Sequence, residues 1–565
     1  MSLFATIQTS ANALQVSQLG LQVVSNNVAN ANTPGYIRQE LVQSTGPAVL
    51  VGGVLLGYGV RANGVVQKFD DFTANQLRET LSNLESSKAL DNLYGQIESV
   101  FSELSDNDLS TKLADFSGSI QDVLNQPGNT SLRRLVIERG KSLTNDIRSA
   151  DSKLRDLKTT LNQGIRDSAI EINRLTDRIA KLNTKIVEIE GGGAVNSDAV
   201  GLRDERQQTL NSLAEIVDIR ASEQQSGSVT VFVGGEYLVS DGMQRKVTVN
   251  VTQRANDSTI ELRLADTDSP LQVSSGRLKG YYDARDRAVS TASADLDKFA
   301  KDLIEQFNLI HTQGQGLTGF SRVTGTNAAD DTTAAIDLAG LPVKIKNGEF
   351  EIQINDSLSG LTQTHVVRVQ LNGGTNDSSL ADVTASIDAI PGISASLTQE
   401  GKLRIESDSD KITFSFQNDS TNFLAAAGIN TFFEGNSAAT IAVNSVVVND
   451  PRMFAASSSG VGGGTDNALK LAQAFDEPLA QLDGRSIKQS YEDLVVRTTQ
   501  EINVQSGVTD GLQNYYKVLE GKLLGVTGVN LDEEAVKMIY YQRAFQASGR
   551  VIQVSSELLD TLMKL

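Results

Sequence analysis

The chain has 565 residues and a formal net charge of −19, and it contains no cysteine. The length favours two to four domains over one compact core. The acidic balance opposes binding to nucleic acid or to anionic membrane surfaces, and the lack of cysteine excludes disulfides, thiolate catalysis and cysteine-bound metals. With only His311 and His365 present, a histidine-based triad or a multi-histidine metal site has almost nothing to draw on.

The N-terminal stretch 1–20 lacks the basic region and the unbroken apolar run of a Sec signal peptide. No window approaches eighteen uninterrupted apolar residues, so we expect no segment that spans a membrane. Taken alone, these features suggest the cytoplasm, and a protein exported without a cleaved signal would look the same.

Residues 3–28 predict the first helix. A seven-residue spacing places four apolar side chains on one stripe, which is typical of a helix that packs on other helices: Ile7, Leu14, Leu21 and Val28. The stretch SNNVANANTPGY at 25–36 then ends it, because asparagine side chains bond to nearby backbone groups and Pro34 disfavours helix at Thr33. Short extended runs with glycine breaks follow, up to about residue 69, and predict one or two hairpins.

A helical pattern returns at 70–104, the stretch NQPGNTS interrupts it, and another helix begins near Leu132. The clearest heptads lie between 154 and 189, where charged residues separate two apolar series that predict a coiled coil: Ile165, Ile172, Ile179 and Ile186 in one, and Leu175 and Leu182 in the other. The stretch GGGAVNSD at 191–198 breaks this helix, and we expect the next one to pair with it in antiparallel orientation.

Residues 222–275 alternate and are rich in β-branched side chains, so they predict strands. A helix is expected from about 283 to 311. Residues 317–455 carry further strand candidates among Asn, Asp, Ser, Thr and Gly, which predicts an inserted β domain of one or two units: EFEIQI, HVVRVQL, KLRIES, KITFSF and AATIAVNSVVV. The glycine-rich stretch 457–467 is interpreted as a flexible joint.

The last 35 residues repeat a large apolar side chain every seven positions: Leu531, Met538, Phe545, Ile552 and Leu559. Burial of so few side chains does not offset the backbone entropy of such a long helix. We therefore expect it to need a partner helix, from its own N-terminus or from a neighbouring subunit.

The predicted fold class is mainly α with inserted β. N- and C-terminal helices pair in a coiled-coil bundle, and an antiparallel β domain is inserted between them. The expected parts are an N-terminal helix with an extended arm, the helical coiled-coil part, a small β subdomain, a returning helix, the outer β domain and the C-terminal helices: 1–70, 71–221, 222–275, 276–316, 317–460 and 461–565.

No stretch predicts an enzyme, a metal site or a cofactor. The glycine run at 460–464 precedes a helix but lacks the Lys-Ser/Thr of a phosphate loop, so it is interpreted as a linker. We expect a capping or packing role for His311. The acidic groups near 196–198 and 406–411 lack the spacing of a calcium loop, and Asn196, Ser197 and Asp198 suit a helix cap.

Two motifs at opposite ends of the chain resemble those of bacterial flagellar rod, hook and hook-associated proteins. The stretch SNNVANANTPGYIRQE carries the first match at these positions: Asn26, Asn27, Ala29, Asn30, Thr33, Gly35 and Tyr36. The last helix carries the second: Leu531, Glu533, Glu534, Gln542, Phe545, Gln546 and Ala547. Within this group, segments such as LRDERQQTLNSLAEIVDI and LAAAGINTFFEG are similar to hook-associated proteins that form the junction between hook and filament.

This resemblance implies an extracellular structural protein of the flagellum, exported unfolded through the flagellar type III apparatus. Its terminal helices would form an inner tube, and its middle domains would face outward. The implied partners are further copies of itself, the hook protein, the second hook–filament junction protein and a cytoplasmic chaperone on the C-terminal region, with no nucleic acid and no membrane insertion. The assembly motif would comprise Asn26, Asn27, Asn30, Thr33, Pro34, Gly35 and Tyr36.

Two other readings stay open. A hook or rod subunit would share the terminal motifs, but hook protein would lack the heptads at 154–189. A secreted adhesin would bind a surface through residues 317–455. An enzyme in the inserted domain is disfavoured, because no coherent set of acid and base side chains is present.

Overall fold

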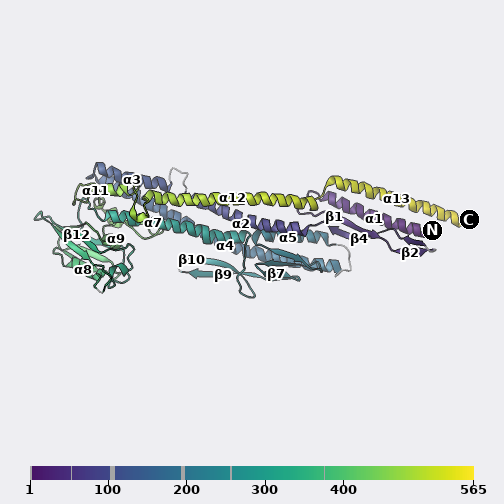
Figure 1. Cartoon of the computed structure of the whole chain (residues 1–565), viewed down its shortest axis with the longest axis horizontal. Helices are drawn as coiled ribbons and strands as arrows, with labels where there is room; N and C mark the ends of the chain where they lie inside the picture. The colour runs from purple at the N-terminus through teal and green to yellow at the C-terminus, as the bar shows by residue number, and fades with distance from the viewer. Residues whose placement is uncertain are drawn as a thin grey trace. The chain divides into compact units, whose positions relative to one another are not determined.

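The computed structural model describes residues 3–51, 54–101, 108–191, 198–254, 257–374 and 376–564. Helices dominate, and the strands form small antiparallel sheets (Figure 1). The predicted combination of a mainly helical chain with inserted antiparallel β structure is confirmed.

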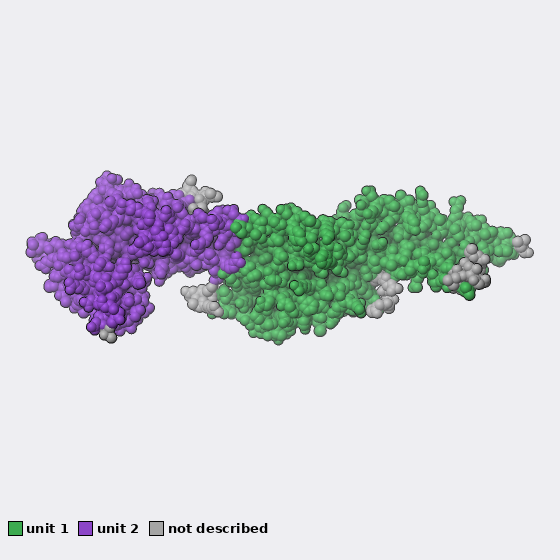
Figure 2. Space-filling view, in the orientation of Figure 1, with its two compact units in different colours: residues 1–93, 159–286, 504–565 green, residues 94–158, 287–503 purple. Residues whose placement is uncertain are grey.

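The chain divides into two compact units (Figure 2). Unit 1 comprises Met1–Leu93, Thr159–Asp286 and Val504–Leu565, and unit 2 comprises Tyr94–Lys158 and Arg287–Asn503. The division falls inside three long helices: α2 (Asp71–Phe101), α4 (Thr130–Glu190) and α12 (Ile487–Thr527). Each unit is therefore built from segments that lie far apart in the sequence.

The two ends of the chain lie side by side in unit 1 (Figure 1). Helix α1 (Leu3–Ala29) packs along helix α13 (Leu531–Lys564), and both agree closely with the predicted first and last helices. A long helix gains most of its stability from such packing, so each end supplies the other with the partner that it needs.

An extended arm follows α1. Strand β1 (Gln39–Thr45) pairs with β4 (Val60–Gln67), and between them β2 (Ala48–Val51) pairs with β3 (Val54–Gly57). The register of the outer pair shifts between Val42 and Gln43. The two antiparallel pairs are the hairpins predicted from the glycine-broken runs.

The middle of unit 1 joins helices to a small β layer. Helix α4 and the following α5 (Val200–Ile216) pack on strands β5 (Arg220–Glu223), β6 (Val229–Val233), β7 (Glu236–Ser240), β8 (Met243–Gln244), β9 (Val247–Arg254) and β10 (Asp257–Leu264). Four residues of the predicted coiled coil share one buried core with these strands: Ile165, Ile172, Leu175 and Ile179. This part of the heptad seam therefore packs on a sheet as well as on a helix.

Unit 2 contains a helical part with an aromatic centre. Helices α3 (Leu109–Asn125), α7 (Ser290–His311) and α11 (Asp466–Gln473) contribute to it. Helix α6 (Arg277–Asp283), which belongs to unit 1, and the π-helical segment Ala284–Val289 precede α7 in the chain. The Phe116 and Phe307 ring centroids lie 5.3 Å apart, and those of Phe432 and Phe433 lie 4.8 Å apart. All four phenylalanines are buried.

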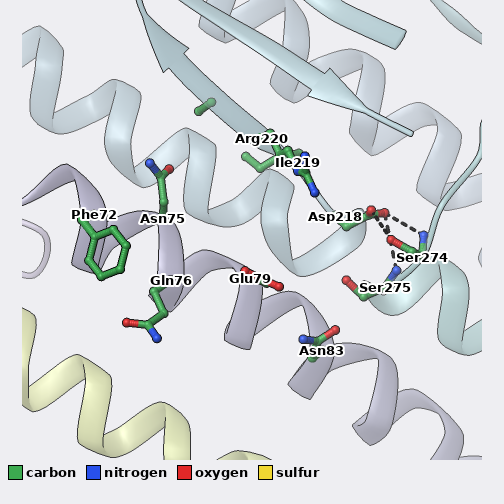
Figure 3. A pocket seen from close by; sticks show the side chains of 11 residues that line it. Phe72, Asn75, Gln76, Glu79, Asn83, Asp218, Ile219, Arg220, Ser274 and Ser275 are labelled. Atoms are coloured by element: carbon green, nitrogen blue, oxygen red, sulfur yellow. Dashed lines mark hydrogen bonds between the residues drawn. The ribbon is translucent and has the colours of Figure 1, made fainter. Parts of the chain in front are cut away.

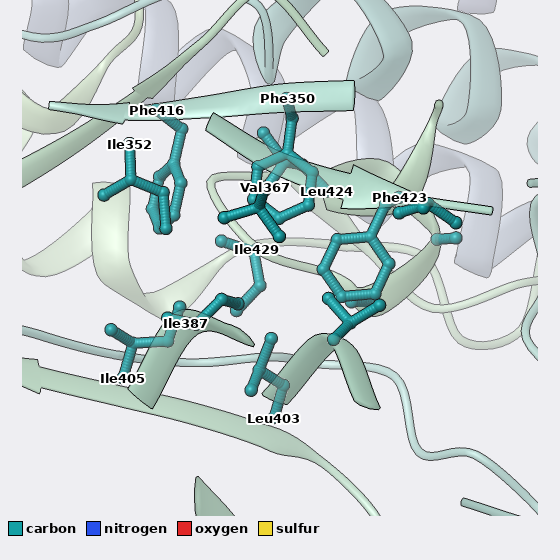
Figure 4. Close-up of a cluster of buried hydrophobic side chains, with 14 of the residues drawn as sticks. Phe350, Ile352, Val367, Ile387, Leu403, Ile405, Phe416, Phe423, Leu424 and Ile429 are labelled. Carbon is teal, nitrogen blue, oxygen red and sulfur yellow. The ribbon is translucent and has the colours of Figure 1, made fainter. Parts of the chain in front are cut away.

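The β part of unit 2 closes around one hydrophobic core (Figure 4). Strand β12 (Gly348–Asp356) lies between β13 (Thr362–Val369) and β16 (Ile412–Gln417), and β15 (Leu403–Ser407) lies between β11 (Arg322–Thr324) and β14 (Ile393–Leu397). Phe350 and Phe416 of the first sheet meet Ile405 of the second in this core (Figure 4). Short elements complete the unit: η3 (Ile336–Leu338), α8 (Leu380–Asp388), α9 (Phe423–Ala427), β17 (Phe433–Glu434), β18 (Ala442–Val443), α10 (Ser445–Asn449), η4 (Pro451–Met453) and η5 (Ala480–Leu482).

The strand predicted at 438–448 is wrong over most of its length. Only Ala442–Val443 is a strand, and Ser445–Asn449 forms helix α10. The Asn444 side chain accepts a hydrogen bond from the Val446 N–H and caps this helix, and Val447 is buried. The cap and the local burial override the β preference of the valines.

Two further expectations differ from the structure. Asn196 and Ser197 lie outside the described residues, and Asp198 does not cap α5, because its carboxylate accepts the Gln67 backbone N–H at 3.2 Å. The predicted joint at 457–467 is tied by backbone bonds to Gln315 and Gly316, so it is a bonded loop rather than an open linker.

Candidate functional site

The asparagine-rich stretch ends α1 through its own side chains. The Asn30 backbone N–H and side-chain amide both donate to the Asn26 carbonyl oxygen at 3.0 Å. The Thr33 N–H then donates to the Asn30 carbonyl and the Tyr36 N–H to the Thr33 carbonyl, which turns the chain. Because asparagine satisfies the free carbonyls at a helix end, the helix stops within one turn.

Asn27 is fully buried, and its amide uses both donors and both acceptors. Its Nδ2 donates to the Gln39 carbonyl at 2.9 Å and to Glu534 Oε2 at 3.0 Å. Its Oδ1 accepts from the Gln39 N–H at 3.0 Å and from the Tyr36 hydroxyl at 2.8 Å. One side chain therefore links α1, the arm and α13.

Glu534 forms a buried ion pair with Arg38. Its side chain is 0% exposed, and its Oε1 lies 3.0 Å from Arg38 Nε and 2.8 Å from Arg38 Nη2. The same Nη2 also lies 2.7 Å from Oε2 of the exposed Glu533. We call Asn27, Arg38, Gln39 and Glu534 the terminal clamp. Every polar atom that it buries has a partner, which is the condition for a stabilising buried ion pair.

The ion pairs also set the protonation of the clamp. Burial alone would lower the pKa of Arg38, but hydrogen bonds to Glu533 and the charge of Glu534 outweigh it and raise that pKa. The Arg38 hydrogen bond lowers the pKa of the Glu533 carboxyl. Arg38 and Glu533 are thus held in their charged forms.

Pro34 and Gly35 connect the turn to α5. Gln208 Nε2 donates to the Pro34 carbonyl at 3.1 Å. Gly35 has φ +78°, and a Cβ at this position would lie 2.2 Å from Gln208 Nε2. The backbone conformation favours glycine here, whereas the close approach involves only the end of the exposed Gln208 side chain.

The Tyr36 hydroxyl feels the charges of two acidic side chains, Asp204 and Glu534. Burial, with the charges of Asp204 and Glu534, raises the pKa of the Tyr36 hydroxyl to about 12. Burial also raises the pKa of the Asp204 carboxyl to about 6, although Asp204 accepts from Gln67 Nε2 at 2.6 Å. Tyr36 is therefore a neutral donor to Asn27 at every physiological pH.

The structure buries a different face of α1 from the one that the heptads indicated. Ile7, Leu14 and Leu21 are half-buried, and Val28 is exposed. The buried side chains lie one to three positions away: Ser10, Val16, Ser17, Val23, Val24 and Asn27. A Cβ at Gly20 would lie 2.5 Å from the Tyr541 ring, so α13 approaches the α1 backbone closely at this point.

On α13, the predicted heptad residues Met538, Ile552 and Leu559 are half-buried, whereas Leu531 and Phe545 are exposed. The helix also presents an outer apolar face to solvent: Val536, Ile539, Tyr540, Val551, Val554, Leu558, Leu562 and Met563. Within the described residues, this chain does not cover that face.

The other predicted residues lie in the interior. All six residues of the predicted coiled coil are buried, with Leu182 and Ile186 beyond the sheet core. His311 is fully buried in unit 2, where it contacts the Asn430 carbonyl through Nδ1 at 2.8 Å and accepts the Ala455 N–H through Nε2 at 3.1 Å. Burial and the charge of Arg133 lower its pKa to about 4, so the ring is a neutral packing group.

Arg38 and Gln39 were not predicted as site residues. Glu533 and Glu534 matched a flagellar motif, but periodicity alone gave them no role. A usable signal was present, since Arg38 is the first cation after the asparagine stretch and three adjacent acids, Asp532, Glu533 and Glu534, open the last helix. Pairing opposite charges between the two motifs would have indicated the clamp.

Among the residues that the structure describes, no group of three or more His, Asp or Glu side chains is arranged to hold a metal ion. In that same part of the chain, no helix combines the length and apolar character needed to cross a membrane.

Three family models match the chain in order. The model described as flagella basal body rod protein matches residues 7–36, which include the asparagine stretch. The model of the flagellar hook-associated protein FlgK helical domain matches 94–327. The model of the flagellar basal body rod FlgEFG protein C-terminal matches 523–565, which include α13 and its half of the clamp.

Full-length relatives agree with these matches. A flagellar hook-associated protein 1 from Escherichia coli is 25% identical over 576 residues and covers 99% of each chain. One from Salmonella typhimurium is 26% identical over 587 residues, again with 99% of each chain covered. One from Bacillus subtilis is 25% identical over 439 residues, with 70% of this chain and 86% of the relative covered.

One solved structure has a similar fold. The flagellar hook junction protein FlgK from Burkholderia pseudomallei aligns with a TM-score of 0.51 at 12% identity, over 80% of this chain and 100% of that chain. At this identity the likeness concerns the fold alone.

Proposed function

The chain belongs to the family of flagellar hook-associated proteins, and from that premise we propose that it is a structural subunit of the layer that joins hook and filament. The observation that carries the proposal is the terminal clamp. Asn27 and Arg38 from one end of the chain hold Glu534 from the other end in a buried, fully bonded network. The network fixes the terminal helices as one assembly element.

The outer face of α13 indicates what this element does. Val536 is 68% exposed and Ile539 is 52% exposed, on a helix that has already packed its other side on α1. A row of exposed apolar side chains of this kind marks an interaction surface. A neighbouring copy that buries it would form the inner part of a tube, with the other parts of the chain outside.

A subunit between hook and filament is also expected to have specific protein partners. A junction subunit would contact the hook protein below and the second hook–filament junction protein above, besides copies of itself. Export through the flagellar type III apparatus, with a cytoplasmic chaperone on the C-terminal region, would keep the apolar face of α13 covered before assembly. The role is structural and involves no catalysis.

Immunogold electron microscopy of isolated flagella tests the assignment, with antibody raised to residues 317–455. We expect label confined to a thin band at the distal end of the hook. Label along the whole hook would make the protein a hook subunit. Absence of label from every flagellum would overturn the flagellar role and favour a surface adhesin.

A second experiment tests the assembly element itself. The double variant Val536→Ser, Ile539→Ser should fold normally but be lost from the hook tip and recovered from the medium. The matched control is Leu358→Ser, since Leu358 is 78% exposed and belongs to the β part of unit 2, whereas α13 belongs to unit 1. Equal recovery of both variants on flagella would contradict a role for the α13 face.

A further inference from the structure

Arg78 on α2 is a buried cation for which no ion pair is formed among the described residues, and Asp71 is the carboxylate whose charge acts on it. It is 4% exposed, and its three nitrogens donate only to neutral amides: Nε to Asn211 at 3.2 Å, Nη1 to Asn75 at 2.6 Å and Nη2 to Gln207 at 2.8 Å. A guanidinium has five N–H donors, so two remain. Within the described residues, no carboxylate lies at ion-pair distance from Arg78.

Other buried arginines show how unusual this arrangement is. Arg38, Arg206 and Arg285 each form an ion pair with a carboxylate. Arg133 also lacks an acid, but it is 0% exposed in the interior of unit 2, where it donates to the Pro127 and Phe454 carbonyl oxygens. Arg78 alone among these five combines a missing counter-ion with access to a groove.

The groove has a volume of about 410 Å³ and lies within unit 1. One side is the turn that contains Pro34 and Gly35, and the other is the end of α12 with the connection to α13, at Tyr516 and Val529. Arg78 and its partners Gln207 and Asn211 also line it. The opening is large enough for side chains from another polypeptide.

A second groove in unit 1, of about 540 Å³, lacks this feature (Figure 3). Phe72, Gln76 and Glu79 line it from α2, opposite Asp218. Asp218 already accepts hydrogen bonds from the Ser274 hydroxyl and N–H, as Figure 3 shows. Among the residues that line this second groove, no buried charged side chain lacks a partner.

We propose that Arg78 is the receptor for an Asp or Glu side chain that a second copy of this chain inserts into the groove. The proposal rests on the proposed function insofar as it requires copies to lie side by side. A carboxylate would supply the charge that the three amides cannot, and the two free N–H groups allow a bidentate pair.

Two observations favour a second copy as the source of the carboxylate. The groove ends at Gly528 and Val529, directly before α13, so a copy that covers the apolar face of α13 passes its mouth. The chain also carries 69 acidic residues against 50 basic ones, which makes a carboxylate the commonest charged group on the neighbour. Glu520 also lines the groove, where it interacts with Tyr516.

The test places the photo-crosslinker p-benzoylphenylalanine at Gln208, an exposed residue of the groove, in full-length protein on flagellated cells. We expect a light-dependent product of twice the chain mass, with the crosslink mapped next to an Asp or Glu. Arg78→Met should lower its yield about tenfold, as expected for loss of one buried charge pair, whereas Arg78→Lys should retain part of it.

Swapping the two charges between the copies controls for misfolding of the single Arg78 variants. Arg78→Glu combined with Lys at the mapped acid should restore the product. An unchanged yield in Arg78→Met, no dimeric product, or a crosslink to another protein would overturn the inference. If immunogold label still forms the band at the hook tip in those cases, the proposed function stands without the inference about Arg78. Absence of label from flagella would refute both the inference and the proposed function.

Discussion

The aromatic cluster of unit 2 and the outer face of α13 in unit 1 are both apolar, and they differ in what covers them. Phe116, Phe307 and Phe432 are fully buried by their own chain, whereas Val536 and Tyr540 are two-thirds exposed. The first set completes a core inside one molecule. The second is a core surface that only another molecule can complete, so substitutions in the two regions should affect different properties.

Phe307→Ala gives the largest expected effect. Phe307 packs against Phe116, Phe432 and Phe433 with centroids 5.0 to 5.3 Å apart. Removal of the ring leaves a cavity and should lower the free energy of unfolding of unit 2 by about 3–5 kcal/mol. Urea denaturation of the full chain, with hydrogen exchange on α7, measures it.

The control for this prediction is Ile539→Ala. It removes a comparable side chain from the exposed face of α13 and should change stability by no more than about 0.5 kcal/mol while it impairs assembly. Equal loss of stability in the two variants would show that α13 is covered within its own chain.

Glu534→Ala should come next in size. It leaves Arg38 and Asn27 without their buried acceptor, with only the exposed Glu533 still paired to Arg38, and such a loss costs about 3 kcal/mol. We expect faster hydrogen exchange along α1 and α13 and none of this effect in unit 2. Glu533→Ala, at the exposed partner of the same arginine, is the matched control and should leave exchange unchanged.

Heptad spacing predicted the elements of both regions but not the extent of their burial. It located α1, α13 and the buried residues of α4, because apolar periodicity records which positions must pack. It did not indicate that α4 packs partly on a sheet, or that Leu531 and Phe545 face solvent, since a repeat contains no information about the partner. Helix α10 was missed because its three valines favour a strand, and the Asn444 cap that stabilises the helix was not recognised in the sequence.

Gly35→Ala tests the turn that joins the regions of unit 1. The positive φ and the contact with Gln208 should make alanine cost about 1–3 kcal/mol, seen as a lower unfolding midpoint. Gly128→Ala is the control, because that glycine has no positive φ and open space around its Cβ. A neutral Gly35→Ala would mean that the turn relaxes freely.

The clamp itself was only half visible in the sequence. Asn27, Tyr36 and Glu534 appeared in motifs, but their mutual bonds span up to 507 positions and depend on the packing of α1 on α13. Arg38 and Arg78 are both buried, and only the folded structure shows that Arg38 contacts a carboxylate whereas Arg78 contacts amides.

Asp204→Asn carries the smallest expected effect and isolates one titration beside the clamp. The folded state raises the pKa of Asp204 from 3.8 to about 6, so it binds a proton more tightly than the unfolded chain does. Linkage then makes this group lower the free energy of unfolding as pH rises from about 4 to 6, with the full penalty present above 6.

After allowance for screening of a half-buried group, the Asp204→Asn variant should be more stable than the native chain by about 1 kcal/mol at pH 7.5 and equal to it at pH 4. The urea midpoints of the native chain and the variant between pH 4 and 8 measure this difference in stability. The contributions of the other carboxylates are the same in both proteins and cancel in the difference. A difference that does not vary with pH would show that Asp204 is as well solvated in the folded protein as in the unfolded chain, and that the arm does not close over it.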